Sequence, residues 1–307
     1  MSTSATVSST LTLTSGKIST GANKVIITTS GSVSRTSGHV IGNLQKAVAT
    51  GSDVSRTFEI GGATNYAPAT VVFASVSVAG DLTASTTDGD HANIATSEVN
   101  PSKSVNRYWT LTSSGGLTFT THSSTFTFVA GDVDAGANTA NFVVRRWSGS
   151  AWSGTTIGTR TTTSTQITAE SNVGDFQVGN VLSVTVSNSV FAFGTEPLNS
   201  WLTPQSSVIT NDGTEAEDIV AKISTFTSGS DTWTLSAASN GADQVRAQWS
   251  TTSASGPWSD IPAYATNVTI ASSLAASGTV TLYFRIQTPT STTSISQYSS
   301  SLTVTAQ

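Results

Sequence analysis

The chain has 307 residues, of which only 10% are charged, and its formal net charge is −5. Soluble proteins carry about 25% charged residues, so serine and threonine take their place here, and a hydroxyl-rich surface of this kind favours an extracellular or particle-surface protein. The acidic balance offers no electrostatic surface to nucleic acid, the absence of cysteine excludes disulfides and zinc–thiolate sites, and no apolar run is long enough for membrane insertion.

The first residues, Met1–Ser9, are small and polar and lack the basic and apolar regions of a signal peptide. Two explanations stay open at this stage. Either a secretion leader has been removed, or the protein assembles in the cytoplasm and leaves it as part of a particle, as virion proteins do.

Residues 10–60 contain short apolar triplets separated by glycine-containing turns, in the stretches 10–20, 23–34 and 38–48. This texture resembles the rungs of a right-handed parallel β-solenoid, or a strand-rich lead-in to a sandwich. Three rungs are about the minimum for a stacked core. We therefore expect a solenoid-like lead-in and not a full solenoid.

The clearest strand pattern lies in Ser104–Asp134, where aromatic and leucine residues alternate with threonine and serine. Alternate side chains of a strand point to opposite faces, so the pattern predicts one face on a core. Ser113–Gly116 forms a turn between two such runs. We expect the central hairpin of a first sandwich, with its core filled by Trp109, Phe119, Phe126 and Phe128.

Four segments carry a resemblance to a known family: LTLTSGKISTGANKVII, SGSVSRTSGHVIGNLQK, TFEIGGATNYAPATVVF and SVNRYWTLT, in this order. Residues 10–180 resemble a β-rich module of large bacterial surface and adhesin proteins, especially those secreted by gliding-type bacteria. The resemblance implies a wall or spacer role and supplies no catalytic residues.

The second half starts near Val181, where a strand ending in Phe-Ala-Phe-Gly194 is followed by one ending in Thr-Asn-Asp-Gly213. This part resembles immunoglobulin-like sandwiches of uncharacterised bacterial envelope proteins, and about seven strands fit one such sandwich. Asn211–Gly213 has the chemistry of a tight hairpin. The expected fold is thus all-β with two modules: residues 1–180, a β-sandwich with a solenoid-like strand lead-in, and residues 181–307, an Ig-like β-sandwich.

Three acidic clusters are candidates for chemistry. Asp132, Asp134 and Asn138 alternate like the start of a calcium loop, although Val143 stands where that loop needs its glutamate; a structural calcium ion and a plain turn are the alternatives. Asp88–His91 fits either a divalent metal site or a hydrogen-bonded turn. Thr214–Asp218 carries Glu215 and Glu217, for which we expect a solvated edge that discourages strand addition.

The tryptophans are the other candidates. Trp109 and Trp233 lie inside alternating strands and are expected in cores. Trp152 and Trp258 lie in turns rich in glycine, serine and proline, where an exposed tryptophan contacts sugars or partner chains, and burial in the core is the alternative.

No nucleophile elbow and no phosphate loop occur in the sequence, so we expect no enzyme. The sequence favours a non-enzymatic structural protein of an extracellular surface assembly, leaning to a virion decoration or fibre component. The alternatives are a bacterial cell-surface adhesin or filament subunit, and a carbohydrate-binding module. Expected partners are other copies of the chain, neighbouring structural proteins or surface glycans, with no cofactor beyond the calcium ion considered above.

Overall fold

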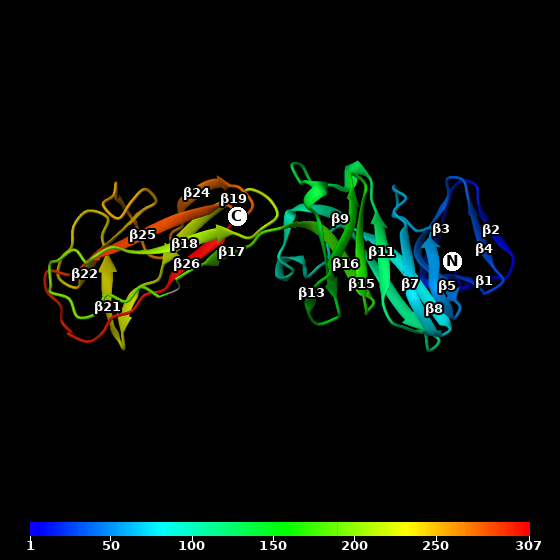
Figure 1. Ribbon diagram of the computed structural model, residues 1–307, viewed down its shortest axis with the longest axis horizontal. Coiled ribbons are helices and arrows are strands. Elements are labelled where there is room, and N and C mark those ends of the chain that lie inside the picture. The colour runs from blue at the N-terminus through cyan, green and yellow to red at the C-terminus, as the bar shows by residue number, and fades with distance from the viewer. Residues whose placement is uncertain (189) are drawn as a thin grey trace. The chain divides into compact units, whose positions relative to one another are not determined.

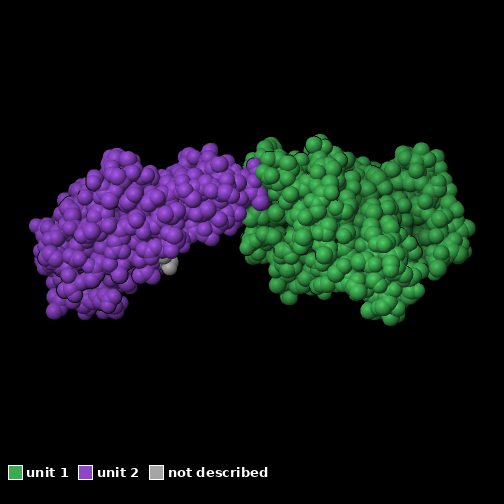
Figure 2. Space-filling view, in the orientation of Figure 1, with its two compact units in different colours: residues 1–181 green, residues 182–307 purple. Residues whose placement is uncertain are grey.

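The computed structural model describes residues 1–188 and 190–307. Regular structure in this part of the chain consists of strands and three short 3-10 turns, which are η1 (Ile94–Thr96), η2 (Ala130–Asp132) and η3 (Thr139–Asn141). The prediction of an all-β chain is confirmed. No helix among the described residues has the length and hydropathy that a membrane crossing requires. The chain forms two compact units, Met1–Val181 and Leu182–Gln307, coloured separately in Figure 2.

Unit 1 starts with coils whose strands pair in parallel. The strands are β1 (Ala5–Val7), β2 (Thr10–Leu13), β3 (Lys17–Ile27), β4 (Ser32–Arg35) and β5 (His39–Val48), blue in Figure 1. Ala5 pairs with Val25, and Val25 pairs with Leu44, so the chain returns to one position about every 20 residues. Thr10 pairs with Ser32 on another side of the coil. Parallel pairing at a fixed period is the arrangement that solenoid rungs require.

Two sheets complete unit 1. The eight-stranded sheet has the order β1-β3-β5-β8-β9-β16-β12-β13, and the six-stranded sheet has the order β10-β7-β11-β15-β14 with β6 on β7. The further strands are β6 (Gly51–Phe58), β7 (Ala69–Val78), β8 (Gly80–Asp88), β9 (Val99–Ser114), β10 (Thr118–Phe119), β11 (His122–Thr127), β12 (Val143–Trp147), β13 (Trp152–Gly154), β14 (Thr156–Thr161), β15 (Ser164–Glu170) and β16 (Gly174–Val181).

One hydrophobic core joins these sheets and the coils. Trp109 on β9 packs against Phe126 on β11 with ring centroids 5.2 Å apart, and Phe126 packs against Phe176 on β16 at 5.0 Å. Trp109, Phe126 and Phe128 are fully buried, as expected, whereas Phe119 is partly buried and packs against the core from its edge. The indole Nε1 of Trp109 donates to the carbonyl of Ala67 at 3.0 Å, which satisfies its one donor.

The predicted hairpin at Ser113–Gly116 is wrong. β9 ends at Ser114 and belongs to the eight-stranded sheet, whereas β10 and β11 belong to the six-stranded sheet and pair with β7. Gly115 and Gly116, both at positive φ, carry the chain from one sheet to the other. Strands that face each other across a core and strands that pair side by side show the same alternation, so the pattern could not separate the two arrangements.

Unit 2 is also built from two facing sheets. A seven-stranded sheet has the order β17-β18-β25-β22-β21-β20 with β23 on β22, and a three-stranded sheet has the order β24-β19-β26. Ile209 and Leu282 of the first sheet form a core cluster with Ile219 and Ile270 of the second, which gives a sandwich-like packing. The strands are β17 (Val184–Val186), β18 (Gln205–Asn211), β19 (Glu217–Ile223), β20 (Phe226–Ser228), β21 (Asp231–Leu235), β22 (Gln244–Ser250), β23 (Ser259–Asp260), β24 (Val268–Leu274), β25 (Thr279–Gln287) and β26 (Leu302–Ala306).

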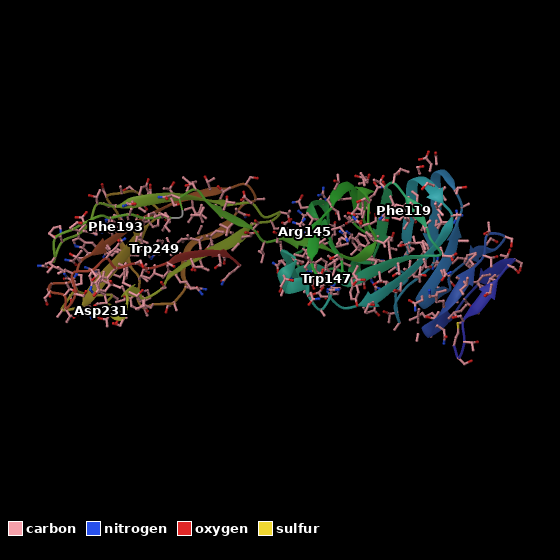
Figure 3. All side chains as sticks on the ribbon, turned by 90° about the horizontal axis from the view of Figure 1, so that it is seen from below. Phe119, Arg145, Trp147, Phe193, Asp231 and Trp249 are labelled. Carbon is pink, nitrogen blue, oxygen red and sulfur yellow. The ribbon has the colours of Figure 1, made fainter. Side chains whose placement is uncertain are left out.

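The tight hairpin predicted at Asn211–Gly213 is wrong for the same reason, because β18 and β19 lie in different sheets. Asn211 is buried and connects three segments by hydrogen bonds. Its side-chain amide nitrogen donates to the carbonyls of Glu215 and Leu274, and its Oδ1 accepts from the Gly213 backbone amide. Trp233 is half-buried, stacks on Tyr298 at 3.9 Å and packs against the second core cluster of unit 2. Trp249, labelled in Figure 3, packs against the same cluster.

Replacing Phe126 by alanine tests the shared core of unit 1. Removing a fully buried aromatic ring between Trp109 and Phe176 leaves a cavity and should lower the free energy of unfolding by about 3–5 kcal/mol. Val78→Ala, at a half-exposed position on β7, is the control and should change it by less than about 0.5 kcal/mol. Urea unfolding followed by tryptophan fluorescence measures both. Equal losses in the two variants would contradict a core centred on these rings.

Candidate functional site

A buried arginine lies in the interior of unit 1. Arg107 alternates on β9 with Val105 and Trp109, so its side chain points to the interior, where only 1% of it is exposed. Its Nε and Nη2 donate to the two carboxylate oxygens of Asp132 at 2.9 and 3.3 Å. Nη2 also pairs with Asp88 at 2.7 Å. A buried charge is tolerated only when partners of this kind surround it.

The loop 61–66 connects this arginine cluster to the parallel coils. On one side, Asn65 donates to Asp132 at 3.0 Å and the Ala63 amide donates to Asp88 at 3.2 Å. Gly62 lies so close to the Asp88 carboxylate that a Cβ atom would collide with it. On the other side, the Gly62 carbonyl lies 2.9 Å from Nε2 of His39 on β5.

The predicted calcium residues face different partners. Asp132 belongs to the arginine cluster just described, whereas Asp134 accepts from the Ser104 amide at 2.9 Å and from Asn106 at 2.7 Å. The Oδ1 of Asn138 accepts from the Ala140 amide, as a cap of η3. Among the described residues no group of three or more histidine, aspartate or glutamate side chains could hold a metal ion. A calcium ion at Asp132, Asp134 and Asn138 therefore stays a prediction, with no converging set of ligands to support it.

The second acidic cluster is likewise spread over separate partners. Asp88 pairs with Arg107, Asp90 accepts from the Ser104 hydroxyl at 2.7 Å, and His91 lies 3.3 Å from Asp175. Burial raises the pKa of Asp90, with a smaller contribution from the charge of Asp134, and the hydrogen bond from Ser104 opposes the shift.

Burial and Arg107 act in opposite directions on Asp132. Burial by itself raises the pKa of its carboxyl group, but the hydrogen bonds and the positive charge of Arg107 favour the ionised form more strongly. The net result is a pKa below the ordinary value of 3.8. Asp132 is thus a permanent counter-ion of Arg107 at neutral pH.

The outer face of the eight-stranded sheet carries an aromatic cluster formed around His91. The loop between β8 and β9 places the His91 ring 4.9 Å from Tyr108, 4.9 Å from Trp152 and 5.6 Å from Trp147. Trp147 pairs with Trp152 across β12 and β13, so these two side chains share one face of the sheet. Arg145 lies two residues before Trp147 on β12, so both side chains lie on that face of the sheet; Figure 3 labels both.

The hydrogen bonds of His91 fix both its tautomer and its neighbours. Its Nδ1 accepts from the Asn93 amide at 3.2 Å, so the proton lies on Nε2, which donates to Asp175 at 3.3 Å. The Asn93 carbonyl in turn accepts from Nε1 of Trp152 at 2.9 Å. Trp152, predicted as a contact residue, is therefore half-buried and held in one orientation.

A shallow depression of about 160 Å³ lies beside Trp152. It forms where β13 approaches residues 96–98, and its lining includes Ser97, Glu98, Arg145, Trp152 and Ser153. Arg145 and Glu98 form an ion pair of 2.7 Å at its side.

Trp258, the other predicted contact residue, packs against an arginine. The guanidinium of Arg285 on β25 lies 4.1 Å from the ring centroid of Trp258 and 4.1 Å from that of Trp201. Arg285 also donates to Oε1 of Gln248, and Arg246 lies 5.4 Å from the Trp201 ring. Trp258 and Trp201 thus serve as stacking partners of Arg285, a role that the turn composition around Trp258 did not indicate.

Unit 2 contains a buried carboxylate, that of Glu217, for which the prediction of solvent exposure is wrong. Glu217 starts β19 and is only 2% exposed, so the expected solvated edge does not apply to it. Its Oε1 accepts from the Ser183 amide at 3.2 Å, while its Oε2 is buried without a hydrogen bond. Burial, together with the charge of Asp212, raises the pKa of Glu217 to about 7, and the Ser183 bond opposes this rise.

A larger hollow, of about 240 Å³, lies among the coils, and Thr28, Ser32, Lys46 and Arg56 contribute to its lining. Its two cationic side chains are paired within the chain. Lys46 contacts Glu59 at 2.7 Å, and Arg56 donates to the carbonyls of Ala47 and Ser55. Burial lowers the pKa of Lys46 although Glu59 opposes the shift.

Comparisons of the chain with protein-family models, curated proteins and solved structures found no match.

Asp132→Asn tests the arginine cluster through pH. Because the folded-state pKa of Asp132 lies below 3.8, its stabilising contribution is present above that pH and is lost as the pH falls through the folded value. We expect the variant to be less stable than the parent at pH 7, with the difference shrinking below pH 4. Asp53→Asn, at an exposed position, is the matched control. A constant difference from pH 7 to pH 2.5 in urea titrations would contradict the pairing.

Glu217→Gln should show the opposite pH dependence. A carboxyl whose folded-state pKa is raised from 4.5 to about 7 stabilises the fold below the lower value, and this stability is lost as the pH rises through the higher value. We expect the thermal midpoint of unit 2 to fall between pH 5 and pH 8 in the parent and to stay level in the variant. Glu196→Gln, at an exposed position, should behave as the parent. Parallel curves for parent and Glu217→Gln would contradict the burial of this carboxylate.

Proposed function

We propose that the chain is a non-enzymatic structural protein of an extracellular surface assembly, with a virion decoration or fibre component as the leading case. The observation that carries the proposal is the use of five basic side chains, those of Lys46, Arg107, Arg145, Arg146 and Arg246. Within the described residues they form ion pairs that tie strands and loops together: Lys46–Glu59, Arg107–Asp88, Arg107–Asp132, Arg145–Glu98, Arg146–Glu170 and Arg246–Asp260. Side chains used in this way support a scaffold, because catalysis needs such groups directed into a cleft.

The architecture supports the same proposal. The parallel coils and facing sheets of unit 1 suit a spacer or wall element, the role implied by the resemblance of residues 10–180 to bacterial surface modules. We also propose that unit 2 is an Ig-like sandwich, on the resemblance of residues 181–307 and on the facing sheets around Ile209 and Ile219. A bacterial adhesin or surface-filament subunit is the alternative setting for the same scaffold.

Partner copies would use the edge strands. β1 and β13 end the eight-stranded sheet, and β26 ends the three-stranded sheet, so each can pair with a further strand. None of these three strands contains a charged residue or a proline, the residues that usually discourage strand addition. We therefore expect association of copies through strand edges supported by hydroxyl-rich faces.

Sedimentation velocity over a concentration series tests the proposal. The parent should form assemblies that grow with concentration, and a lysine on an edge strand, as in Thr6→Lys on β1 or Thr305→Lys on β26, should reduce them. Thr162→Lys, in an exposed turn, adds the same charge away from these edges and is the control. A parent that stays monomeric at the highest concentration would overturn self-association. Capsid and tail genes beside the coding sequence would favour the virion setting, and secretion genes would favour the bacterial surface.

A further inference from the structure

The depression beside Trp152 combines an immobilised aromatic ring with polar side chains. Trp152 is held by its hydrogen bond to Asn93, by a T-shaped contact with the His91 ring at an interplanar angle of 80°, and by Trp147 at 5.3 Å. A ring fixed in this way loses little conformational freedom when a ligand packs on it. This arrangement does not depend on self-association of the chain.

The polar side of the depression is the Arg145–Glu98 pair. Arg145 donates from Nη2 to the Glu98 carboxylate and from Nε to the Ser97 carbonyl, and only 19% of its side chain is exposed. The Glu98 side chain is 66% exposed and accepts from Arg145 through Oε2, which leaves Oε1 as a further acceptor. Glu98 also has a φ of 67°, a backbone conformation that residues other than glycine seldom adopt.

The chemistry of these groups selects a class of ligand. A pyranose ring has an apolar C–H face, which packs on an aromatic face, and an edge of adjacent hydroxyls, which bond to a planar carboxylate and guanidinium. Because Glu98 neutralises Arg145, the pair offers no net positive charge to attract phosphate or sugar acids. A hollow of about 160 Å³ suits one ring and not an extended chain.

We propose that the depression beside Trp152 binds a single neutral sugar ring, at the end or on a branch of a glycan, by stacking on Trp152 and hydrogen bonding to Glu98 and Arg145. For a site of this size we expect a dissociation constant of about 1 mM for a free monosaccharide. Several copies held together would raise the avidity.

The test uses an array of immobilised neutral oligosaccharides, followed by saturation-transfer NMR with free glucose, galactose, mannose and N-acetylglucosamine. The parent should bind at least one of these probes. Glu98→Ala should weaken binding at least tenfold, with a small fall in the thermal midpoint because its ion pair with Arg145 is lost. Trp152→Phe keeps a ring in place and should weaken binding less than Trp152→Ala.

Trp258→Phe is the matched control in unit 2 and should bind as the parent does. The proposal is overturned if the parent binds no probe at millimolar concentration. It is also overturned if Glu98→Ala and Trp152→Ala bind as well as the parent, and loss of binding in Trp258→Phe alone would place the sugar site in unit 2 instead. Neither result depends on whether copies of the chain associate.

Discussion

The burial of Arg107 is the constraint on which the architecture of unit 1 depends. Its guanidinium is taken out of water beside Trp109, and Asp88 and Asp132 offset the cost of that burial. These carboxylates come from the end of β8 and from η2 after β11, and both also bind the loop 61–66. One buried cation thereby fixes the ends of both sheets and, through Gly62 and His39, the coils as well. We expect such a cluster to specify one arrangement of loops more than it adds net stability.

The sequence predicts which faces are buried better than it predicts which strands pair. Alternation on Ser104–Asp134 identified Trp109, Phe126 and Phe128 as core residues, and all three are buried. The alternation could not show that Gly115 and Gly116 lead to a second sheet. A strand paired in the same sheet and a strand in the facing sheet give the same period of two. The two hairpin predictions failed for this one reason.

For the candidate sites, too, the sequence indicates single residues but not their partners, which lie far away along the chain. Trp152 stands out in the sequence because of its turn, but its neighbours His91 and Glu98 come from the β8–β9 loop, more than 50 residues earlier. Asp132 stands out in the sequence as part of an acidic loop. Its partner, Arg107, could be noticed only because it lies between the inward-facing Val105 and Trp109 on β9. Glu217 alternates on β19 with Ile219 and Ala221, and this register was the local sign of its burial. Arg107 lowers the pKa of Asp132 whereas burial raises that of Glu217, so the environment of each carboxyl group sets the direction of its pKa shift.

Native-state hydrogen exchange on unit 1 tests the central role of Arg107 most directly. The amides of Ala63 and Val129 bond to Asp88 and Asp132, and the amide of Asp132 bonds to the Val129 carbonyl. The account predicts that these amides open with the same free energy as Trp109 on β9, and that Arg107→Met lowers this free energy for all of them together. Fast exchange of Ala63 and Val129 in the parent, with β9 still protected, would contradict it.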